Sequence, residues 1–214
     1  MELEEAIKTR RSIRKYQDKD VPLDVIMKAI NLACWAPNGG NYQSWKFFVV
    51  KNRALINRMA DTLQEKMDRM CQWPEVGEFG ETFQRYSRNA CFFRNAGALI
   101  AVGHGEYQSA ADKVLKRRGP ADPEAREMIE NRAAVASKIQ TVGGLVATLL
   151  LALHQEGLGA CWMAGPMLIR REMEKMLGVP DDIRLFALVP VGYPAETPAP
   201  GPRKALEEIV TILE

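Results

Sequence analysis

Residues 35–51 read "WAPNGGNYQSWKFFVVK", and this stretch contains the end of a helix, a polar turn and a strand. Pro37, Gly39 and Gly40 do not favour a continuing helix, so the apolar helical pattern before them is expected to end here. Residues 45–51 are aromatic and β-branched, a composition typical of a short strand. The stretch therefore predicts a helix that leads through a turn into a sheet.

Outward from this stretch, helical and strand patterns alternate along the chain. Strands are predicted at residues 45–51, 96–103, 159–165 and 184–194, and helices at residues 3–8, 22–36, 54–72, 122–155 and 169–178. Because the strands are mostly apolar, the pattern indicates an α/β or α+β fold in which helices cover a central sheet. The chain has no internal repeat or low-complexity linker, so residues 1–214 are expected to form a single domain.

The composition is that of an ordinary globular protein, with 47% hydrophobic and 26% charged residues among 214. A formal net charge of +2 gives no general attraction to nucleic acids or acidic membranes, so neither is an expected partner. The four cysteines form no C-x-x-C pair, which favours reduced thiols and a cytoplasmic location over a metal site.

A long apolar run lies within the helix predicted at residues 122–155. The uncharged part, residues 141–153, is shorter than the roughly 20 residues that a membrane span needs. A helix that is apolar on every side is expected to be buried all round. Because a chain this small has little interior to surround such a helix, we expect an interface between two copies there.

The segment "TRRSIRKY" at residues 9–16 concentrates positive charge. If it is extended, Arg10, Ser12 and Arg14 point to one side while Arg11 points to the other with Ile13 and Lys15. Two guanidinium groups beside a hydroxyl suit a phosphate, which arginine can bind in a bidentate manner. The alternative is a solvated basic turn, and from the arginines alone this is the favoured interpretation.

The polar turn at residues 37–44 has a second possible role. Its glycines allow a flat ligand to approach the backbone closely. Asn41 and Gln43 offer both a donor and an acceptor to the edge of a heterocycle. The alternative is a polar connection between helix and strand without a ligand.

Together, four motifs resemble the nitroreductase family of flavin enzymes: "RRSIRKY", "WAPNGGNYQSWKFFVV", "GLGACWMAGP" and "VPVGYPAETPAPGPRKALEEI". They occur in the family's order and cover nearly the whole chain. The resemblance implies a three-layer α+β fold whose central sheet is mostly antiparallel and covered by helices. It also implies a homodimer in which the C-terminal extension, residues 196–214, lies on the partner subunit.

The resemblance further implies FMN as cofactor, NADH or NADPH as electron donor, and a small-molecule acceptor such as a nitroaromatic compound or a quinone. FMN would carry the chemistry in a ping-pong reaction, so neither a catalytic side chain nor a metal is expected. The phosphate and ribityl chain would contact Arg10, Arg11, Ser12, Arg14 and Arg203. The ring would contact Pro37, Asn38, Gly39, Asn41, Gln43, Met163, Ala164 and Gly165, some of them from the other subunit.

Three positions within the quoted motifs depart from the family's pattern, as do Ala147 and Thr148 in the long helix, where many members have Gln-Asn. Asn38 replaces a serine and Ser44 replaces a proline, and both are polar changes that preserve a turn. Ala164 stands where one branch of the family has glutamate, so a carboxylate role from that branch does not carry over. Other open functions are specialised flavin chemistry on the same fold, namely reductive dehalogenation or flavin breakdown, and a non-enzymatic flavin- or phosphate-binding protein.

Residues 73–95 have an irregular aromatic pattern that allows two interpretations. They form either a mobile cover over the flavin or a helical hairpin whose aromatic side chains, Phe79 and Phe83 among them, pack in the core. The basic run at residues 113–119 is interpreted as a solvated helix end, because Gly119 and Pro120 follow it directly. His104, His154 and the cysteines are not expected to be catalytic.

Overall fold

The apolar run in the middle of the chain forms the central strand β2, Ala98–Gly105, in which all eight residues are buried. The structure, a computed structural model, describes residues 1–213. The other strands are β1 (Trp45–Val50), β3 (Gly159–Ala160) and β4 (Ile183–Gly192). The strand order is β1-β2-β4-β3 and every neighbouring pair is antiparallel, which confirms the predicted sheet.

Strand β3 is much shorter than the strand predicted at residues 159–165. Beyond Ala160, the Cys161 N–H still donates to the Pro190 carbonyl at 3.4 Å. Pro190 has no N–H to donate in return, so the antiparallel ladder cannot continue through this pair. Met163 pairs once more with Leu188, as an isolated bridge. The prediction was therefore wrong about the length of this strand and right about its place beside β4.

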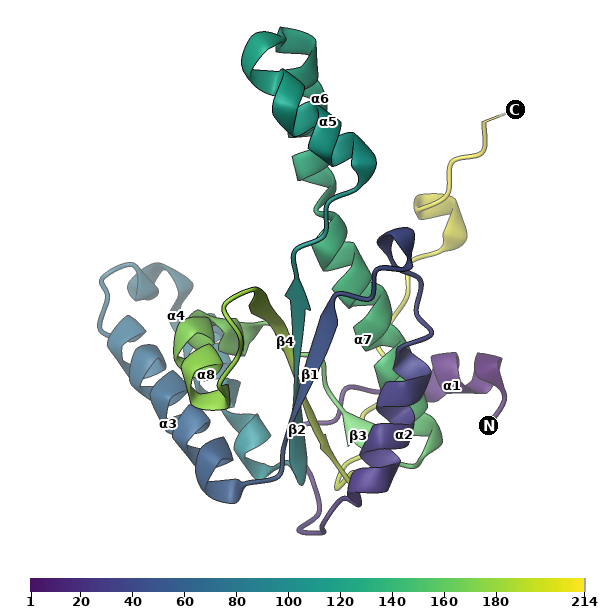
Figure 1. Ribbon diagram of the computed structural model, residues 1–214. Helices are drawn as coiled ribbons and strands as arrows, with labels where there is room; N and C mark the ends of the chain where they lie inside the picture. The colour runs from purple at the N-terminus through teal and green to yellow at the C-terminus, as the bar shows by residue number, and fades with distance from the viewer. Residues whose placement is uncertain (214) are drawn as a thin grey trace.

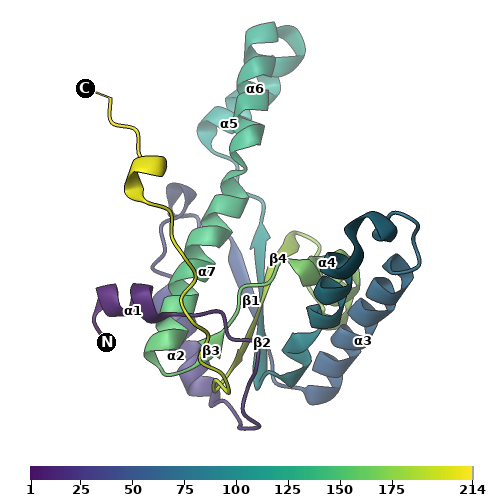
Figure 2. The same ribbon diagram turned by 180° about the vertical axis from the view of Figure 1, so that it is seen from behind.

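Helices cover both faces of the sheet, as Figures 1 and 2 show. They are α1 (Leu3–Thr9), α2 (Leu23–Ala33), α3 (Arg53–Met70), α4 (Val76–Asn89), α5 (Ala110–Arg118), α6 (Pro123–Val135), α7 (Ser137–Gln155) and α8 (Arg170–Leu177). Because side chains alternate along β2, Ile100 and Val102 pack with α2 and α7, whereas Leu99 and Ala101 pack with α3 on the other face. This arrangement confirms the three-layer prediction.

The helix predicted at residues 122–155 is interrupted. Asp122 caps its start as predicted, accepting hydrogen bonds from the backbone N–H groups of Glu124 and Ala125 at 3.0 and 3.4 Å. At Ala136 the backbone turns left-handed, with φ 51° and ψ 49°, and separates α6 from α7. The Gln140 side chain donates to the Val135 carbonyl at 2.8 Å, satisfying one acceptor at the end of α6.

Helix α7 lies against α2 and the sheet through seven buried residues: Val142, Leu145, Val146, Leu149, Leu150, Ala152 and Leu153. By length and composition alone, residues Pro123–Gln155 could cross a membrane, yet the left-handed turn at Ala136 interrupts them and seven residues of α7 are buried within the domain. The helix is not buried all round within one chain, because Ala147 is exposed and Gly143, Gly144 and Thr148 are only half-buried.

Two parts of the chain extend away from the sheet. Helices α5 and α6 project together beyond its end, and the C-terminal extension leaves the body in a different direction (Figures 1 and 2). The basic residues at the end of α5 are exposed, which confirms the predicted solvated helix end. Large apolar side chains of the extension are also exposed: Leu206, Ile209, Val210, Ile212 and Leu213.

The aromatic side chains of residues 73–95 do not share one environment. Phe93 is fully buried, whereas Phe79 and Tyr86 on α4 are 61% and 46% exposed. The interpretation that these aromatics simply pack in the core is therefore wrong for Phe79 and Tyr86. Within α4, Gly80 has φ 47° and ψ −127°, a backbone conformation that glycine adopts without steric cost and that kinks the helix.

Candidate functional site

The basic segment leaves α1 as extended chain and lies across β3. Ser12 and Ala160 form a parallel bridge, and the Ile13 N–H donates to the Ala160 carbonyl at 3.0 Å. Ile13 is buried against Gly159, where a Cβ would lie 2.8 Å from Cγ1 of Ile13. Glycine at this position therefore allows the segment to approach β3, which orients the arginines on either side of Ile13.

Predicted site residues line three cavities, of which the first, here called the Arg11 cavity, has a volume of about 310 Å³. Its polar lining consists of Thr9, Arg10, Arg11, His154, Glu196 and Thr197. Nη1 of Arg11 donates to the carbonyls of Lys8 and Arg10 at 2.7 and 2.8 Å, but its buried Nε has no hydrogen-bond partner among the described residues. Because buried donors are nearly always satisfied, this orphaned N–H points to a missing acceptor such as a phosphate oxygen.

Among residues 1–213, Glu196 is the one carboxylate that lines the Arg11 cavity. Its Oε1 accepts hydrogen bonds from the backbone N–H groups of Arg14 and Lys15, at 2.6 and 3.0 Å. The basic segment thus already binds an anionic group through its backbone, on the C-terminal side of the two cavity arginines.

The second cavity, the Arg14 cavity, has a volume of about 610 Å³ and lies between α4 and the chain that follows β3. Residues from that chain are Cys161, Trp162, Met163, Ala164, Gly165 and Pro166, and residues from α4 are Thr82, Arg85, Tyr86 and Asn89. The Tyr86 hydroxyl would lie 2.9 Å from a Cβ on Gly165, so glycine leaves room for this side chain to approach. Helix α4 is therefore a wall of the cavity that contains the predicted flavin-lining residues.

The Cys161 thiol in this cavity is not prepared to act as a nucleophile. Burial raises its pKa, and the nearby Arg14 guanidinium opposes this only in part. A thiol with a raised pKa stays protonated near neutral pH and is poorly reactive. The side chain therefore contributes packing beside Ser12 and Arg14.

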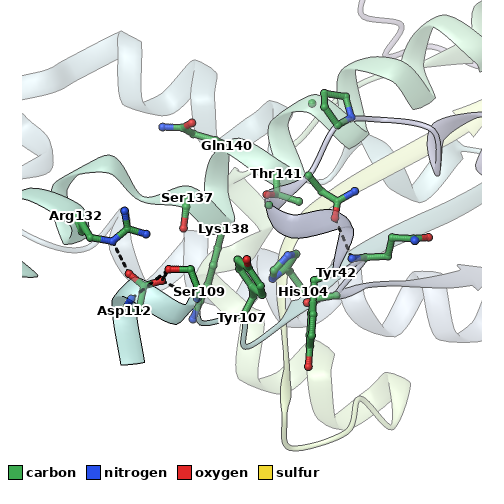
Figure 3. A pocket seen from close by; sticks show the side chains of 16 residues that line it. Tyr42, His104, Tyr107, Ser109, Asp112, Arg132, Ser137, Lys138, Gln140 and Thr141 are labelled. Atoms are coloured by element: carbon green, nitrogen blue, oxygen red, sulfur yellow. Dashed lines mark hydrogen bonds and ion pairs between the residues drawn. The ribbon is translucent and has the colours of Figure 1, made fainter. Parts of the chain in front are cut away.

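The third cavity, the Tyr107 cavity, has a volume of about 540 Å³ and is shown in Figure 3. One wall is the polar turn, where the Asn38 Oδ1 accepts the Gln43 N–H at 3.0 Å. Residues Gly40, Asn41 and Gln43 in this turn have positive φ angles of 59°, 51° and 52°. The Tyr107 ring covers the glycines closely, since a Cβ on Gly39 would lie 3.1 Å from it.

The opposite wall of the Tyr107 cavity carries charged side chains from α5, α6 and α7 (Figure 3). Arg132 forms an ion pair with Asp112, and Lys138 forms one with Glu106. The hydrogen bond from Arg132 holds the pKa of Asp112 well below its usual range, with further hydrogen bonds from Ser109. These contacts fix the orientation of α5 relative to α6.

His104 lies at the floor of the Tyr107 cavity and is buried. Its Nδ1 donates to the Gly105 carbonyl at 2.5 Å, so Nε2 of the neutral ring carries no proton. Burial lowers the pKa of His104, which keeps the ring neutral near pH 7.

The structure distributes the predicted cofactor residues over these three cavities. Arg10 and Arg11 line the first, Arg14 and the residues Met163, Ala164 and Gly165 line the second, and Pro37, Asn38, Gly39 and Gln43 line the third. The first two cavities lie along the same pairing of the basic segment with β3. The third is built from other elements, and neither Ser12 nor Asn41 lines any of the three.

Arg203 lies away from all three cavities, on the exposed C-terminal extension. Its guanidinium donates only to the carbonyls of Gly201 and Pro202 within residues 1–213. Within one chain it therefore does not join the other predicted phosphate-binding arginines.

Several lining residues were missed by the sequence analysis. They are Thr9 and His154 in the first cavity, Arg85, Tyr86 and Asn89 in the second, and Tyr107, Asp112, Arg132 and Lys138 in the third. Only the Ser109–Asp112 pair had a readable signal, since this spacing is that of a helix capping box.

Comparison with known proteins gives consistent findings. A sequence model described as "Nitroreductase family" matches residues 7–193. A putative NADH dehydrogenase/NAD(P)H nitroreductase from Methanothermobacter thermautotrophicus is 30% identical over 200 residues, covering 92% of this chain and 80% of that protein. The crystal structure of a BluB-like flavoprotein from Clostridium difficile 630 superimposes with a TM-score of 0.87 at 26% identity and covers both chains fully. An iodotyrosine deiodinase bound to FMN and 3-iodo-L-tyrosine has a TM-score of 0.70 at 24% identity, covering 100% of this chain and 98% of that one.

Proposed function

This chain belongs to the nitroreductase family, and we propose that it is an FMN-dependent oxidoreductase that takes hydride from NADH or NADPH. We further propose that it passes the reducing equivalents to nitroaromatic, quinone or related small-molecule acceptors in a ping-pong reaction. The likeness to a putative NAD(P)H nitroreductase supports the donor, and the FMN bound in a related fold supports the cofactor.

One observation carries the cofactor assignment: two cavities adjoin a single pairing of the basic segment with β3. The Arg11 cavity offers arginines and the orphaned Nε of Arg11 to a phosphate. The Arg14 cavity offers a larger, partly apolar space beside Met163 and Gly165 for a ring system. The residues present therefore fit a cofactor that has a phosphate at one end and a flat ring at the other.

In the proposed enzyme the side chains bind and orient, and bound FMN supplies the hydride chemistry. Arg10 and Arg11 bind the phosphate, and the chain around Met163 supports one side of the ring. Tyr86 and α4 limit the access of water to the Arg14 cavity. The neutral Cys161 thiol and the neutral His104 ring need take no part in proton transfer.

We also propose that the protein is a homodimer. The polar turn at residues 37–44 lines a cavity separate from the two that suit FMN, so it would contact the ring bound by a second copy. The exposed apolar side chains of the C-terminal extension and the uncovered side of α7 offer surfaces for such a partner. Sedimentation analysis that finds only monomers of the flavin-loaded protein would contradict this assembly.

The test of the proposed function is the visible absorbance of the purified protein, followed by anaerobic addition of NADH or NADPH. We expect a flavin spectrum that bleaches with at least one of the two nucleotides and recovers when a nitroaromatic or quinone acceptor is added. A protein that is colourless and does not take up added FMN would refute the cofactor assignment.

A second candidate is the same fold with specialised flavin chemistry, namely reductive dehalogenation or breakdown of the flavin. The likeness to an iodotyrosine deiodinase bound to FMN and 3-iodo-L-tyrosine supports reductive dehalogenation as this second candidate. The same experiment separates the two candidates. A bound flavin that neither NADH nor NADPH bleaches would favour the specialised chemistry.

A further inference from the structure

The Arg11 cavity contains a histidine that neither the sequence motifs nor the proposed hydride transfer uses. His154 lies in the last turn of α7, and its Nε2 is 2.9 Å from Oγ1 of Thr9 at the end of α1. Both residues line the cavity together with Arg10 and Arg11. The histidine thus lines the same cavity as the two arginines, and the Nε of Arg11 has no hydrogen-bond partner among the described residues.

The hydrogen bonds of Thr9 determine where the His154 ring can gain a proton. The Thr9 hydroxyl donates its single proton to the Glu5 carbonyl at 2.7 Å. Its oxygen must therefore accept from His154, so Nε2 carries the proton of the neutral ring. Nδ1 is the nitrogen that remains free to be protonated.

Charge balance gives this second proton a role. The charged side chains that line the cavity are Arg10, Arg11 and Glu196, and together they leave one positive charge. A phosphate monoester carries a charge of about −1.5 to −2 near pH 7. Protonation of the His154 ring would supply one further positive charge beside the phosphate.

We propose that His154 is a proton-dependent phosphate-binding residue, neutral in the empty cavity and cationic when the FMN phosphate is bound. This inference rests on the proposed function, because it assumes that the phosphate is that of FMN. Thr9 orients the ring, and binding of the phosphate dianion is accompanied by uptake of a proton at Nδ1.

The groups that face His154 support both states. In the free protein, burial lowers the pKa of His154, Arg10 and Arg11 lower it further, and Glu5 opposes them. A phosphate dianion between the arginines cancels their repulsion and attracts the imidazolium, so binding must raise the pKa. Affinity for the dianion therefore increases as the pH falls through the bound-state pKa, and the increase is complete below the free-state pKa.

The experiment compares FMN with riboflavin, which lacks the phosphate, in the wild-type protein and the His154→Gln variant. Dissociation constants are measured by quenching of flavin fluorescence between pH 8 and pH 5.5. We expect the FMN affinity of the wild type, relative to that of the variant, to rise about tenfold on acidification for each unit by which binding raises the pKa. Riboflavin should show no such difference between the two proteins.

The two-protein ratio removes other titrations from the comparison. The FMN phosphate loses charge below its own pKa of about 6. This effect is common to the two proteins and cancels. A FMN-to-riboflavin preference with the same pH profile in both proteins would overturn the inference and leave the proposed function intact.

An independent measurement does not depend on the variant folding well. The chain has only two histidines, so the ring signals of His104 and His154 can be followed separately by NMR with and without FMN. We expect FMN to raise the pKa of His154, and inorganic phosphate to raise it by a smaller amount. A shift with phosphate but none with FMN would overturn the assignment to the cofactor, whereas a protein that binds neither FMN nor riboflavin would refute the proposed function itself.

Discussion

Replacement of Gly159 by alanine should separate the basic segment from β3. A Cβ at this position would lie 2.8 to 2.9 Å from Cγ1, Cβ and Cγ2 of Ile13. Ile13 is β-branched and buried, so its side chain cannot rotate away, and the segment itself must move. Overpacking of this kind costs about 1–3 kcal/mol of unfolding free energy.

The same displacement should weaken FMN binding, because Ile13 lies between Arg11 and Arg14 in the chain. Loss of one charge-assisted hydrogen bond to the phosphate corresponds to about a tenfold loss of affinity or more. The stability effect is measured by urea unfolding of the apoprotein, and the affinity by fluorescence quenching. Gly77→Ala is the matched control, because no atom lies within 4 Å of its Cβ position.

A double-mutant cycle identifies the contact itself. Ile13→Ala alone should cost about 2–5 kcal/mol, since it leaves a cavity in a buried site. In combination with Gly159→Ala it removes two of the three clashing atoms. The double variant should therefore lose about 0.5–3 kcal/mol less unfolding free energy than the two single variants lose in sum. Additive effects, or a Gly159→Ala protein as stable as the Gly77→Ala control, would refute the described packing.

Three further predictions concern other parts of the molecule. Burial lowers the pKa values of His104 and His154, so the unfolded state binds more protons, and the melting temperature of the apoprotein should fall as the pH drops through about 6.5; a melting temperature that is constant or rises between pH 7.5 and 5.5 would contradict this. Asp112→Asn removes the carboxylate that binds Arg132, so amide hydrogen exchange should accelerate in α5 and α6 but not in α2; equal protection in both proteins would show that the ion pair does not hold these helices. Removal of residues 197–214 should shift the protein toward monomers and weaken FMN binding, as measured by sedimentation and fluorescence titration. A truncated protein that remains dimeric would contradict this prediction.

The sequence predicted those elements whose local signals agree with their packing. Strand β2 is apolar from Ala98 to Gly103 because both of its faces are covered, and Asp122 before Pro123 gives a cap that needs no tertiary context. The kink at Ala136 has no such signal, because alanine favours helices and only the surrounding contacts hold it at positive φ. Pro190 did carry a signal against a long β3, and its missing N–H explains why that strand stops.

The candidate site shows the same division. The arginines and glycines of the motifs could be located from the sequence because they are adjacent in the chain. The hydrogen bond between Thr9 and His154 joins residues that are 145 positions apart, and no periodicity or motif indicates it. The Tyr86 hydroxyl above Gly165 is likewise a product of helix placement. Long-range packing therefore supplies the residues that surround the motifs, and these are the ones that sequence reasoning missed.

The start of the C-terminal extension connects the proposed cofactor site to the proposed dimer. The Ala195 N–H donates to the Lys15 carbonyl at 3.0 Å, and Glu196 accepts from the N–H groups of Arg14 and Lys15. The extension therefore begins on the basic segment before it leaves the body (Figure 2).

If the extension binds a second copy, the position of the basic segment depends on that contact, and FMN binding and dimer formation must favour each other equally. FMN should then lower the protein concentration at which dimers form, and sedimentation at micromolar and nanomolar concentrations, with and without FMN, would measure this coupling. A Glu196→Gln variant should reduce the coupling while still forming dimers at high concentration, because its side chain binds the segment less strongly than a carboxylate does. Dimer formation that is independent of FMN in the wild-type protein would show that the extension and the cofactor site act separately.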